Sequence, residues 1–378
     1  MKIALITETF PPEVNGVAMT LHRLVTGLHK RGNHMTVVRP RQEADKTRRE
    51  EKDYEEILVK GYSIPRYQGL QFGVPARRRL KAVWRKEKPD LIHIATEGPL
   101  GYSALGAADD LNIPTISTFH TNFHSYGDHY GYGFFTKPLM RFFKYFHNRT
   151  GATYVPSDEV KEELEEQGIN NVRILSRGVD TELFTPARRS EKLRTEWGVE
   201  PSTPVVLYVG RVANEKNIPL TVKAFTRFKE LEPNAKLVIV GDGPERKNLE
   251  KEHPDIHFAG MRKGEDLAAH YASGDFFFFG SVTETFGNVV TEAMASGLIV
   301  LCYDYAAGKR HIVNGENGFT APYKDEAGFL KTIEQVTNAK PLWPTIAEAA
   351  NRTAADISWA KIIAKFEEEL REFADVKE

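Results

Sequence analysis

The 378-residue chain contains a single cysteine, Cys302. One cysteine excludes an internal disulfide framework and a zinc site built on several thiolates. Long apolar runs are also missing, because no stretch approaches the roughly 18 residues that a membrane-spanning helix needs. The segment from Met1 to Ile6 is followed at once by polar residues and lacks the apolar core of a signal peptide. We therefore expect a cytoplasmic protein that begins with a buried strand.

An excess of one charge sign is lacking over the chain as a whole. Lys and Arg number 51 and Asp and Glu 52, for a net charge of −1. This balance, and the absence of a zinc-finger or RNA-recognition motif, argue against nucleic acid as a partner. Basic residues are nevertheless in excess in the first half, most densely between Arg39 and Pro89. That excess indicates either an anionic surface as partner or a solvated helical face.

Short apolar runs alternate with longer amphipathic stretches along the chain. Runs rich in Val, Ile and Phe, such as Val205–Val209 and Ile299–Cys302, predict strands buried on both faces. The segments between such runs, for example Val17–Arg31 and Ile218–Leu231, predict helices. Alternating strands and helices favour parallel sheets with right-handed crossovers. Two successive series predict an α/β fold with two Rossmann-like domains.

The two series meet near residue 177. We expect an N-terminal Rossmann-like domain over residues 1–177 and a C-terminal Rossmann-like domain over residues 178–360, with the boundary close to Arg177–Pro186. The last helix, over about residues 361–378, is expected to pack back on the N-terminal domain. With 41% hydrophobic residues, the chain can bury a large core.

Unusual residues follow several predicted strands, which is where open α/β sheets bind ligands. Gly16 opens the first predicted helix and lets a phosphate approach its free N–H groups. Arg211 and Lys216 follow the strand Val205–Val209 and have the charge to clamp a diphosphate. Each feature also has an ordinary structural explanation, namely a turn glycine and an exposed basic loop.

Two carboxylates flank a second helix start. Glu284 ends a predicted strand, Glu292 lies about two turns into the next helix, and Gly287 and Asn288 open that helix. Paired carboxylates can accept hydrogen bonds from sugar hydroxyls, and they are also the acid and base of glycosidases. A glycosidase would leave the diphosphate-type loop without a role, so the pattern favours a sugar nucleotide.

A cluster of histidines follows the strand Thr115–Thr118. His120 comes first, and His124, Asp128 and His129 lie just beyond it. Their spacing matches none of the zinc motifs that have a known mechanism. We therefore expect no metal site and interpret His120 as a single histidine that lines the ligand site.

In combination these segments resemble the retaining glycosyltransferases of family GT4, including mannosyl- and sulfoquinovosyl-type lipid glycosyltransferases. That family has the GT-B fold, in which two Rossmann-like domains face each other across a cleft. The resemblance implies that the N-terminal domain, residues 1–177, binds the acceptor and that the C-terminal domain, residues 178–360, binds the nucleotide-sugar donor. The resembling segments span nearly the whole chain and are Asn15–Val17, Phe119–Thr121, Ser176–Asp180, Gly210–Arg211, Glu215–Asn217, Val240–Pro244, and the pair Glu284 and Glu292 followed by Ala293–Gly297.

The resemblance implies metal-independent transfer of a hexose, with retention, from GDP-mannose or a UDP-hexose to an acceptor hydroxyl, without a cofactor. The implied catalytic residues are His120, Arg211, Lys216 and Glu284. The implied donor-binding residues are Gly16, Arg211 and Lys216 for the diphosphate, Glu284 and the backbone of Phe286, Gly287, Asn288 and Val289 for the sugar, Glu292 for the ribose, and Met261 and Arg262 beside the base.

The acceptor is less well defined by the sequence. Phe134–Arg149 mixes aromatic and basic residues, which suits either an amphipathic helix on an anionic membrane or a helix packed on the core. Together with the basic run Arg77–Lys86, it favours peripheral contact with the inner face of the cell membrane and a lipid or glycolipid acceptor. A soluble or polysaccharide acceptor is the alternative.

Two other classes of function stay open at this point. A GT-B epimerase or hydrolase would consume the sugar nucleotide without an acceptor. A catalytically silent binding protein would bind nucleotide and be indifferent to Glu284→Gln.

Overall fold

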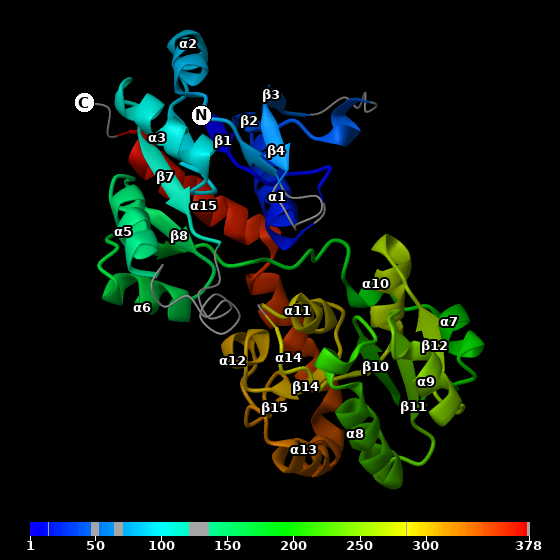
Figure 1. Cartoon of the computed structure of the whole chain (residues 1–378). Helices are drawn as coiled ribbons and strands as arrows, with labels where there is room; N and C mark the ends of the chain where they lie inside the picture. The colour runs from blue at the N-terminus through cyan, green and yellow to red at the C-terminus, as the bar shows by residue number, and fades with distance from the viewer. Residues whose placement is uncertain (14, 47–52, 64–70, 121–135, 285, 376–378) are drawn as a thin grey trace. The chain divides into compact units, whose positions relative to one another are not determined.

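The computed structural model of the chain describes residues 1–13, 15–46, 53–63, 71–120, 136–284 and 286–375. These residues form two compact units. Unit 1 comprises Met1–Arg177 and Ala360–Glu378, and unit 2 comprises Gly178–Trp359. Each unit has its own parallel sheet with helices packed on it (Figure 1).

The sheet of unit 1 has the strand order β3-β2-β1-β6-β7-β8-β9. All its neighbouring strands pair in parallel. Strands β2 and β3 follow β1 on one side of it, and β6 to β9 lie in order on its other side. The topological switch point therefore lies between β1 and β6. The strands are β1 (Lys2–Ile6), β2 (His34–Pro40), β3 (Glu55–Val59), β6 (Leu91–Ile94), β7 (Thr115–Thr118), β8 (Thr153–Val155) and β9 (Val172–Ile174), and an antiparallel pair consists of β4 (Gly61–Ser63) and β5 (Gln71–Gly73).

Side-chain caps fix the starts of two helices in unit 1. The Asn15 side chain accepts a hydrogen bond from the Ala18 N–H, and Ser157 does the same for Val160. Both helices therefore begin where the sequence offers an N-cap residue. The helices of unit 1 are α1 (Gly16–Lys30), η1 (Glu43–Lys46), α2 (Arg77–Glu87), α3 (Pro99–Asp109), α5 (Thr136–His147), α6 (Asp158–Glu166) and α15 (Trp359–Ala374).

The sheet of unit 2 has the order β12-β11-β10-β13-β14-β15, and its neighbouring strands are again parallel. Its switch point lies between β10 and β13. The central strand β13 consists of four buried phenylalanines, as a strand covered on both faces requires. The strands are β10 (Val205–Val209), β11 (Lys236–Val240), β12 (His257–Gly260), β13 (Phe276–Phe279), β14 (Ile299–Tyr303) and β15 (Phe319–Ala321).

One large hydrophobic core in unit 2 joins the sheet to the helices packed on it. The helices are η2 (Pro186–Arg188), α7 (Glu191–Glu196), η3 (Asn214–Lys216), α8 (Ile218–Leu231), α9 (Arg246–Glu252), α10 (Gly264–Ser273), α11 (Asn288–Ala295), α12 (Ala307–His311), α13 (Glu326–Asn338), η4 (Lys340–Leu342) and α14 (Trp343–Asp356).

Helix α15 follows unit 2 in the sequence but packs on unit 1. Its Phe366 ring lies 5.7 Å from the ring of His93 and 5.0 Å from that of Tyr154, between ring centroids. Its buried Glu367 accepts hydrogen bonds from Arg31 at 2.5 Å and Asn33 at 2.8 Å. The last helix therefore completes the core of the unit in which the chain begins.

The aromatic side chains of α5 decide between the two interpretations of that segment. Phe143 and Phe146 are buried in the cores of unit 1, and Phe142 packs against them. The outward side carries Leu139 and Tyr145, which are exposed, together with basic residues. The prediction that this helix places its phenylalanines on a membrane is therefore wrong, because these side chains already pack against the sheet. Phe134 and Phe135 lie outside the described residues.

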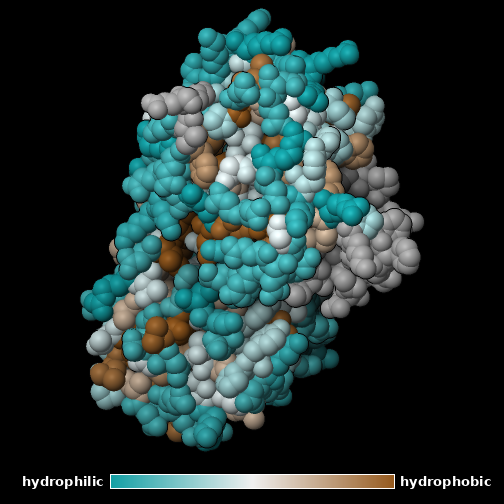
Figure 2. Space-filling view, turned by 90° about the vertical axis from the view of Figure 1, so that its left-hand side faces the viewer, coloured by the Kyte–Doolittle hydropathy of each residue, from teal (hydrophilic) through white to brown (hydrophobic). Residues whose placement is uncertain are grey.

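The face drawn in Figure 2 is mostly hydrophilic, with apolar residues in separate areas between polar ones. Within the described ranges, no helix combines the length and the apolar character needed to cross a bilayer.

The α/β class and the parallel sheets expected from the sequence are confirmed, with strand and helix ends shifted by a residue or two. The edge strands β3 and β15 and the pair of β4 and β5 were not expected. They are short or carry charged residues, as in Glu55–Val59, so their apolar pattern is weak.

Glu367 generates a prediction about stability. Burial alone would raise the pKa of this carboxyl, but hydrogen bonds from Asn33, Arg31 and Arg371 lower it to about 2. A depressed pKa stabilises the fold at neutral pH, and that contribution is lost as the pH falls from about 4.5 to about 2. We expect Glu367→Gln to destabilise unit 1 by about 1.5–3 kcal/mol at pH 7.

Urea unfolding followed at pH 7 and pH 2.5 checks this expectation. The difference between the wild type and Glu367→Gln should shrink at the lower pH. An equal difference at both pH values would mean that the ionised carboxylate is not the source of the stability.

Candidate functional site

Two loops of unit 2 meet at the carboxyl ends of β10 and β13, beside the switch point of the sheet. Lys216, in the first loop, places its Nζ 2.5 Å from Oε1 of Glu284 in the second. The Ser281 hydroxyl donates to the same oxygen at 2.7 Å. The side chains of Lys216 and Glu284 are 20% and 16% exposed. The sequence singled out both charged residues, and the structure brings them together.

Two tyrosines from farther along the chain hold the loop of Glu284. The Tyr305 hydroxyl donates to the backbone carbonyl of Glu284 at 2.9 Å, and the Tyr323 hydroxyl donates to that of Val282 at 2.9 Å. Their rings stack with centroids 4.4 Å apart. Sequence reasoning missed this pair, although Tyr305 follows β14 and so lies at the edge of the sheet where ligands bind.

The start of α11 beside this loop has backbone geometry that suits an anion or a sugar. Gly287 has a φ of +86°, and a Cβ there would lie 3.3 Å from that of Ala307. Helix α11 begins at the exposed Asn288, where the first helical N–H groups have no partner within the helix. Ala306 has a φ of +49°, a strained value that is often found at functional sites. A small cavity here is lined by Phe279, Ser281, Glu284, Gly287, Val290, Cys302, Tyr303, Tyr305, Ala306 and Ala307.

The backbone segment expected to contact the sugar lies at this helix start. Phe286 is buried, and its carbonyl accepts from the Ala307 N–H at 2.9 Å. Val289 is half-buried in the first turn of α11. The loop is therefore anchored to α12 at Phe286.

Glu292 is half-buried within α11. Its Oε2 accepts a hydrogen bond from the Tyr271 hydroxyl at 3.0 Å. Burial raises the pKa of Glu292 to about 7, although this hydrogen bond opposes the rise. A carboxyl that changes its charge near neutral pH is frequently a ligand-binding or catalytic group.

The remaining candidates in unit 2 follow strands of the same sheet. Arg211 is 67% exposed, and its Nη1 lies 3.3 Å from Glu215 of the same loop, so the structure pairs it with that carboxylate and Lys216 with Glu284. Met261 is 59% exposed directly after β12. The neighbouring Arg262 donates from Nε to the Ala259 carbonyl at 2.9 Å.

Gly16 and His120 belong to unit 1. Gly16 is the first residue of α1, and a Cβ there would lie 3.5 Å from a guanidinium nitrogen of Arg177. Burial, together with the charge of Arg177, lowers the pKa of His120 to about 4, so its ring is neutral at pH 7. Its Nε2 is buried and has no hydrogen-bond partner among the described residues. His124, Asp128 and His129 lie outside those residues.

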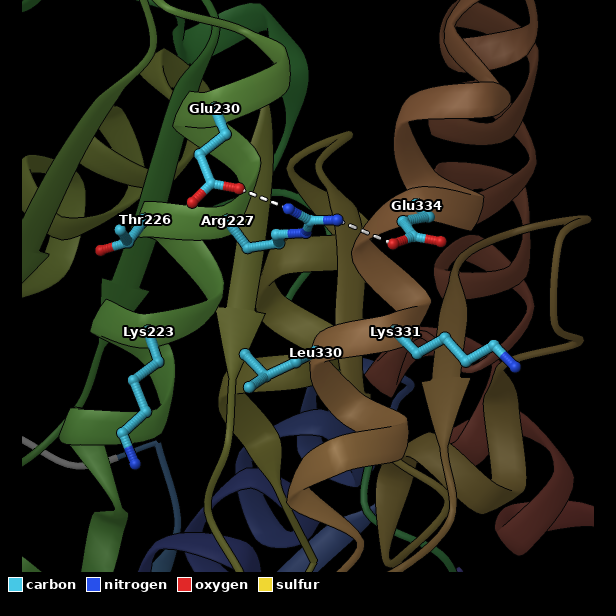
Figure 3. A pocket seen from close by; sticks show the side chains of 7 residues that line it. All are labelled: Lys223, Thr226, Arg227, Glu230, Leu330, Lys331 and Glu334. Atoms are coloured by element: carbon cyan, nitrogen blue, oxygen red, sulfur yellow. Dashed lines mark hydrogen bonds and ion pairs between the residues drawn. The ribbon is translucent and has the colours of Figure 1, made fainter.

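A separate groove lies between α8 and α13 (Figure 3). Arg227 bridges it, with Glu230 at 2.5 Å on one side and Glu334 at 2.9 Å on the other. The guanidinium of Arg227 is already paired with two carboxylates, and the groove lies between helices. It therefore suits an anionic ligand less well than the ends of the strands do.

Comparison with known proteins identifies the family of this chain. Residues 14–183 match the model of glycosyltransferase family 4, and residues 189–353 match that of glycosyl transferases group 1. The chain is 35% identical over 316 residues to a GDP-mannose-dependent alpha-mannosyltransferase of Mycobacterium tuberculosis, covering 83% of this chain and 81% of that protein. This chain belongs to glycosyltransferase family 4.

More distant relatives extend the comparison over the whole enzyme. The glycosyltransferase is 28% identical to an alpha-monoglucosyldiacylglycerol synthase of Streptococcus pneumoniae, over 90% of this chain and 79% of that one. Its fold is similar to that of HepE of Anabaena, solved in complex with UDP, with a TM-score of 0.73 at 20% identity, over 98% of this chain and 100% of that one. The GT-B fold expected from the sequence is therefore confirmed.

Glu292 generates a prediction about the stability of the glycosyltransferase. Because its pKa is raised from 4.5 to about 7, the ionised carboxylate destabilises the fold as the pH rises through this range. Glu292→Gln, which keeps an acceptor for Tyr271, should therefore stabilise unit 2 at pH 8.5 by up to roughly 3 kcal/mol and have little effect at pH 5. Thermal unfolding at the two pH values measures the difference. A stabilisation that does not depend on pH would contradict the raised pKa.

Proposed function

We propose that this glycosyltransferase moves a hexose from a nucleoside diphosphate sugar, either GDP-mannose or a UDP-hexose, to a hydroxyl of a membrane lipid or glycolipid. The transfer retains the anomeric configuration and uses neither a metal ion nor another cofactor. Similarity to a GDP-mannose-dependent mannosyltransferase and to a monoglucosyldiacylglycerol synthase supports the donor and acceptor classes.

The observation that carries the proposal is the contact between Lys216, Glu284 and Ser281 at the switch point of unit 2. An ion pair largely removed from water is costly, so its presence at a strand end favours a binding role over a stabilising one. In the proposed complex Lys216 binds the diphosphate, and Glu284 accepts hydrogen bonds from the sugar.

Arg211 is the second cation of the proposed diphosphate site. Its contact with Glu215 is an exposed pair four residues apart, worth about 0.3–0.5 kcal/mol. A diphosphate can therefore displace Glu215 at small cost. Two cations aimed at the leaving group supply the charge stabilisation that a metal ion provides in other enzymes.

The other proposed roles follow the family resemblance. The N–H groups at the start of α11, from Phe286 to Val289, bind the sugar, Glu292 binds the ribose, and Met261 and Arg262 border the base. In unit 1 the N-terminus of α1 at Gly16 binds the diphosphate, and the neutral ring of His120 binds the reacting sugar. The leaving diphosphate oxygen takes the proton of the acceptor hydroxyl, so the transfer occurs on one face of the sugar.

The decisive variant is Glu284→Gln. It removes the charge that accepts the sugar hydroxyls and should lower the transfer rate by about 10²-fold, comparable to the loss of one preorganised transition-state contact. Thermal shifts with GDP and UDP first identify the base, because a ligand that binds the folded state raises its stability. Product release from the matching sugar nucleotide then gives the rate.

Glu230→Gln, in the groove of Figure 3, is the matched control and should stay within twofold of the wild type. A rate within threefold of the wild type for Glu284→Gln would remove Glu284 from the donor site. Full consumption of the donor without any acceptor would instead identify a hydrolase or epimerase.

Membrane contact in this proposal involves the basic helix α2. Arg78, Arg85 and Lys86 are exposed on it, whereas Arg77 and Lys81 lie 2.8 Å from Asp110. The exposed side chains suit the anionic inner face of a membrane, to which each basic residue contributes about 1 kcal/mol.

Co-sedimentation with phosphatidylglycerol vesicles tests this contact. Changing Arg78, Arg85 and Lys86 to Ser should weaken binding by about fivefold for each charge removed, and added salt should weaken binding of the wild type. Ser substitution of Arg227, Lys229 and Lys331, which lie in unit 2, is the control. Equal binding to neutral phosphatidylcholine vesicles would contradict the electrostatic contact.

A further inference from the structure

Two carboxylates, Glu8 and Glu97, follow the strands on either side of the switch point in unit 1. Glu8 comes after β1, and Glu97 comes after β6, which pairs with β1 in parallel. Ligands of open α/β sheets bind at such a point. Neither residue was among the candidates expected from the sequence.

Glu8 has a structural task that leaves it unsuited to a ligand. Its carboxylate accepts hydrogen bonds from the backbone N–H groups of Gly73 and, at 3.0 Å, of Leu100. It thereby joins β5 to the start of α3. Burial raises its pKa to about 7 even with these donors.

Glu97 contacts a buried histidine instead. Its Oε1 lies 3.2 Å from Nε2 of His147, whose side chain is fully buried, while the side chain of Glu97 is 12% exposed. On the far side of the ring, Nδ1 lies 2.9 Å from the Ser117 hydroxyl. Ser117 also contacts the hydroxyls of Thr150 and Thr153, at 2.9 and 3.1 Å.

The contact between Glu97 and His147 is not a hydrogen bond. Oε1 of Glu97 and Nε2 of His147 are both buried, and neither atom has a hydrogen-bond partner among the described residues. The ring is oriented from its other side by the hydrogen bond between Nδ1 and the Ser117 hydroxyl. Glu97 therefore lies against a fixed imidazole, and its Oε1 is left without a donor.

The same residue types form the triad of serine hydrolases, but the order of exposure here is reversed. Ser117 lies within β7 and is fully buried, so it cannot attack a substrate. The carboxylate is the member nearest to solvent. The chain therefore presents an acid rather than a nucleophile.

Glu97 and His120 follow neighbouring strands of the sheet. Ile94 of β6 pairs with Ser117 of β7, and each of the two residues lies three positions beyond that pair. Both residues thus lie beyond the same edge of the sheet. Under the proposed function, His120 binds the transferred sugar, so a carboxylate at this edge lies on the side from which the acceptor arrives.

We propose that Glu97 is an acceptor-binding residue, whose carboxylate accepts a hydrogen bond from an uncharged hydroxyl of the acceptor, and that His147 is its positioning residue. This inference rests on the proposed function. A negative carboxylate attracts a hydroxyl donor and repels a phosphate, so the acceptor presents an uncharged hydroxyl, such as that of a diacylglycerol or of a sugar.

The test compares Glu97→Gln and Glu97→Ala with the wild type. The probes are the sugar nucleotide that matches the base found by thermal shift, and diacylglycerol in phosphatidylglycerol vesicles. We expect kcat/KM for the acceptor to fall by about 10- to 100-fold, as for the loss of a hydrogen bond to a charged group. KM for the donor, nucleotide affinity and slow donor hydrolysis should stay within twofold.

Two further variants separate binding from folding. His147→Gln, which keeps a polar side chain against Glu97, should raise KM for the acceptor less than Glu97→Ala does and leave donor hydrolysis unchanged. Glu166→Gln, an exposed acid on α6, should match the wild type. A purely structural role for Glu97 would lower Tm and reduce transfer and donor hydrolysis together, which would overturn the proposal.

Other outcomes distinguish this inference from the proposed function beneath it. If Glu284→Gln abolishes transfer and both Glu97 variants keep the KM for the acceptor within twofold, only the inference about Glu97 is wrong. If Glu284→Gln has no effect, the donor site itself is wrong. Equally fast transfer to D-inositol 3-phosphate would contradict the preference for an uncharged acceptor.

Discussion

The contact between Lys216 and Glu284 depends on a constraint that organises both units: neighbouring strands of a parallel sheet end at the same edge. In unit 2 this edge brings a loop after β10 to a loop after β13, although the two residues are 68 positions apart. The opposite charges attract strongly because little water reaches them. Ser281, Tyr305 and Tyr323 then fix the loop around Glu284.

The same constraint operates in unit 1 with a different outcome. There the strand ends carry two acids and a histidine, and the structure assigns each acid a different task. Glu8 accepts hydrogen bonds from backbone N–H groups of β5 and α3, whereas Glu97 contacts the imidazole of His147. Because His147 contacts one side of the Glu97 carboxylate, the proposed ligand binds on the other side. Burial and partners therefore decide the role of each acid more than its position in the sequence does.

Much of this architecture could be predicted from the sequence because it rests on local pattern. Ile218–Leu231 forms the predicted helix, and Val205–Val209 the predicted strand, since each has a strong apolar period. The tyrosines around Glu284 could not be predicted, because they approach it only through the order of strands. Nor could the partner of Arg211, since a flexible exposed side chain has no pattern that reveals which carboxylate it contacts.

The crossing of the chain between the units has a topological consequence. The chain leaves unit 1 after Arg177 and returns to it at Ala360. Beside these crossings, the Trp359 N–H donates to the Val179 carbonyl at 3.0 Å, and a Cβ at Gly178 would lie 2.8 Å from the Trp359 nitrogen. A single proteolytic nick after Arg177 would separate residues 1–177 from the rest of the chain, and only the non-covalent packing of α15 on unit 1 would then hold the two pieces together. Shortening the carboxyl terminus would therefore damage the unit that the ribosome makes first.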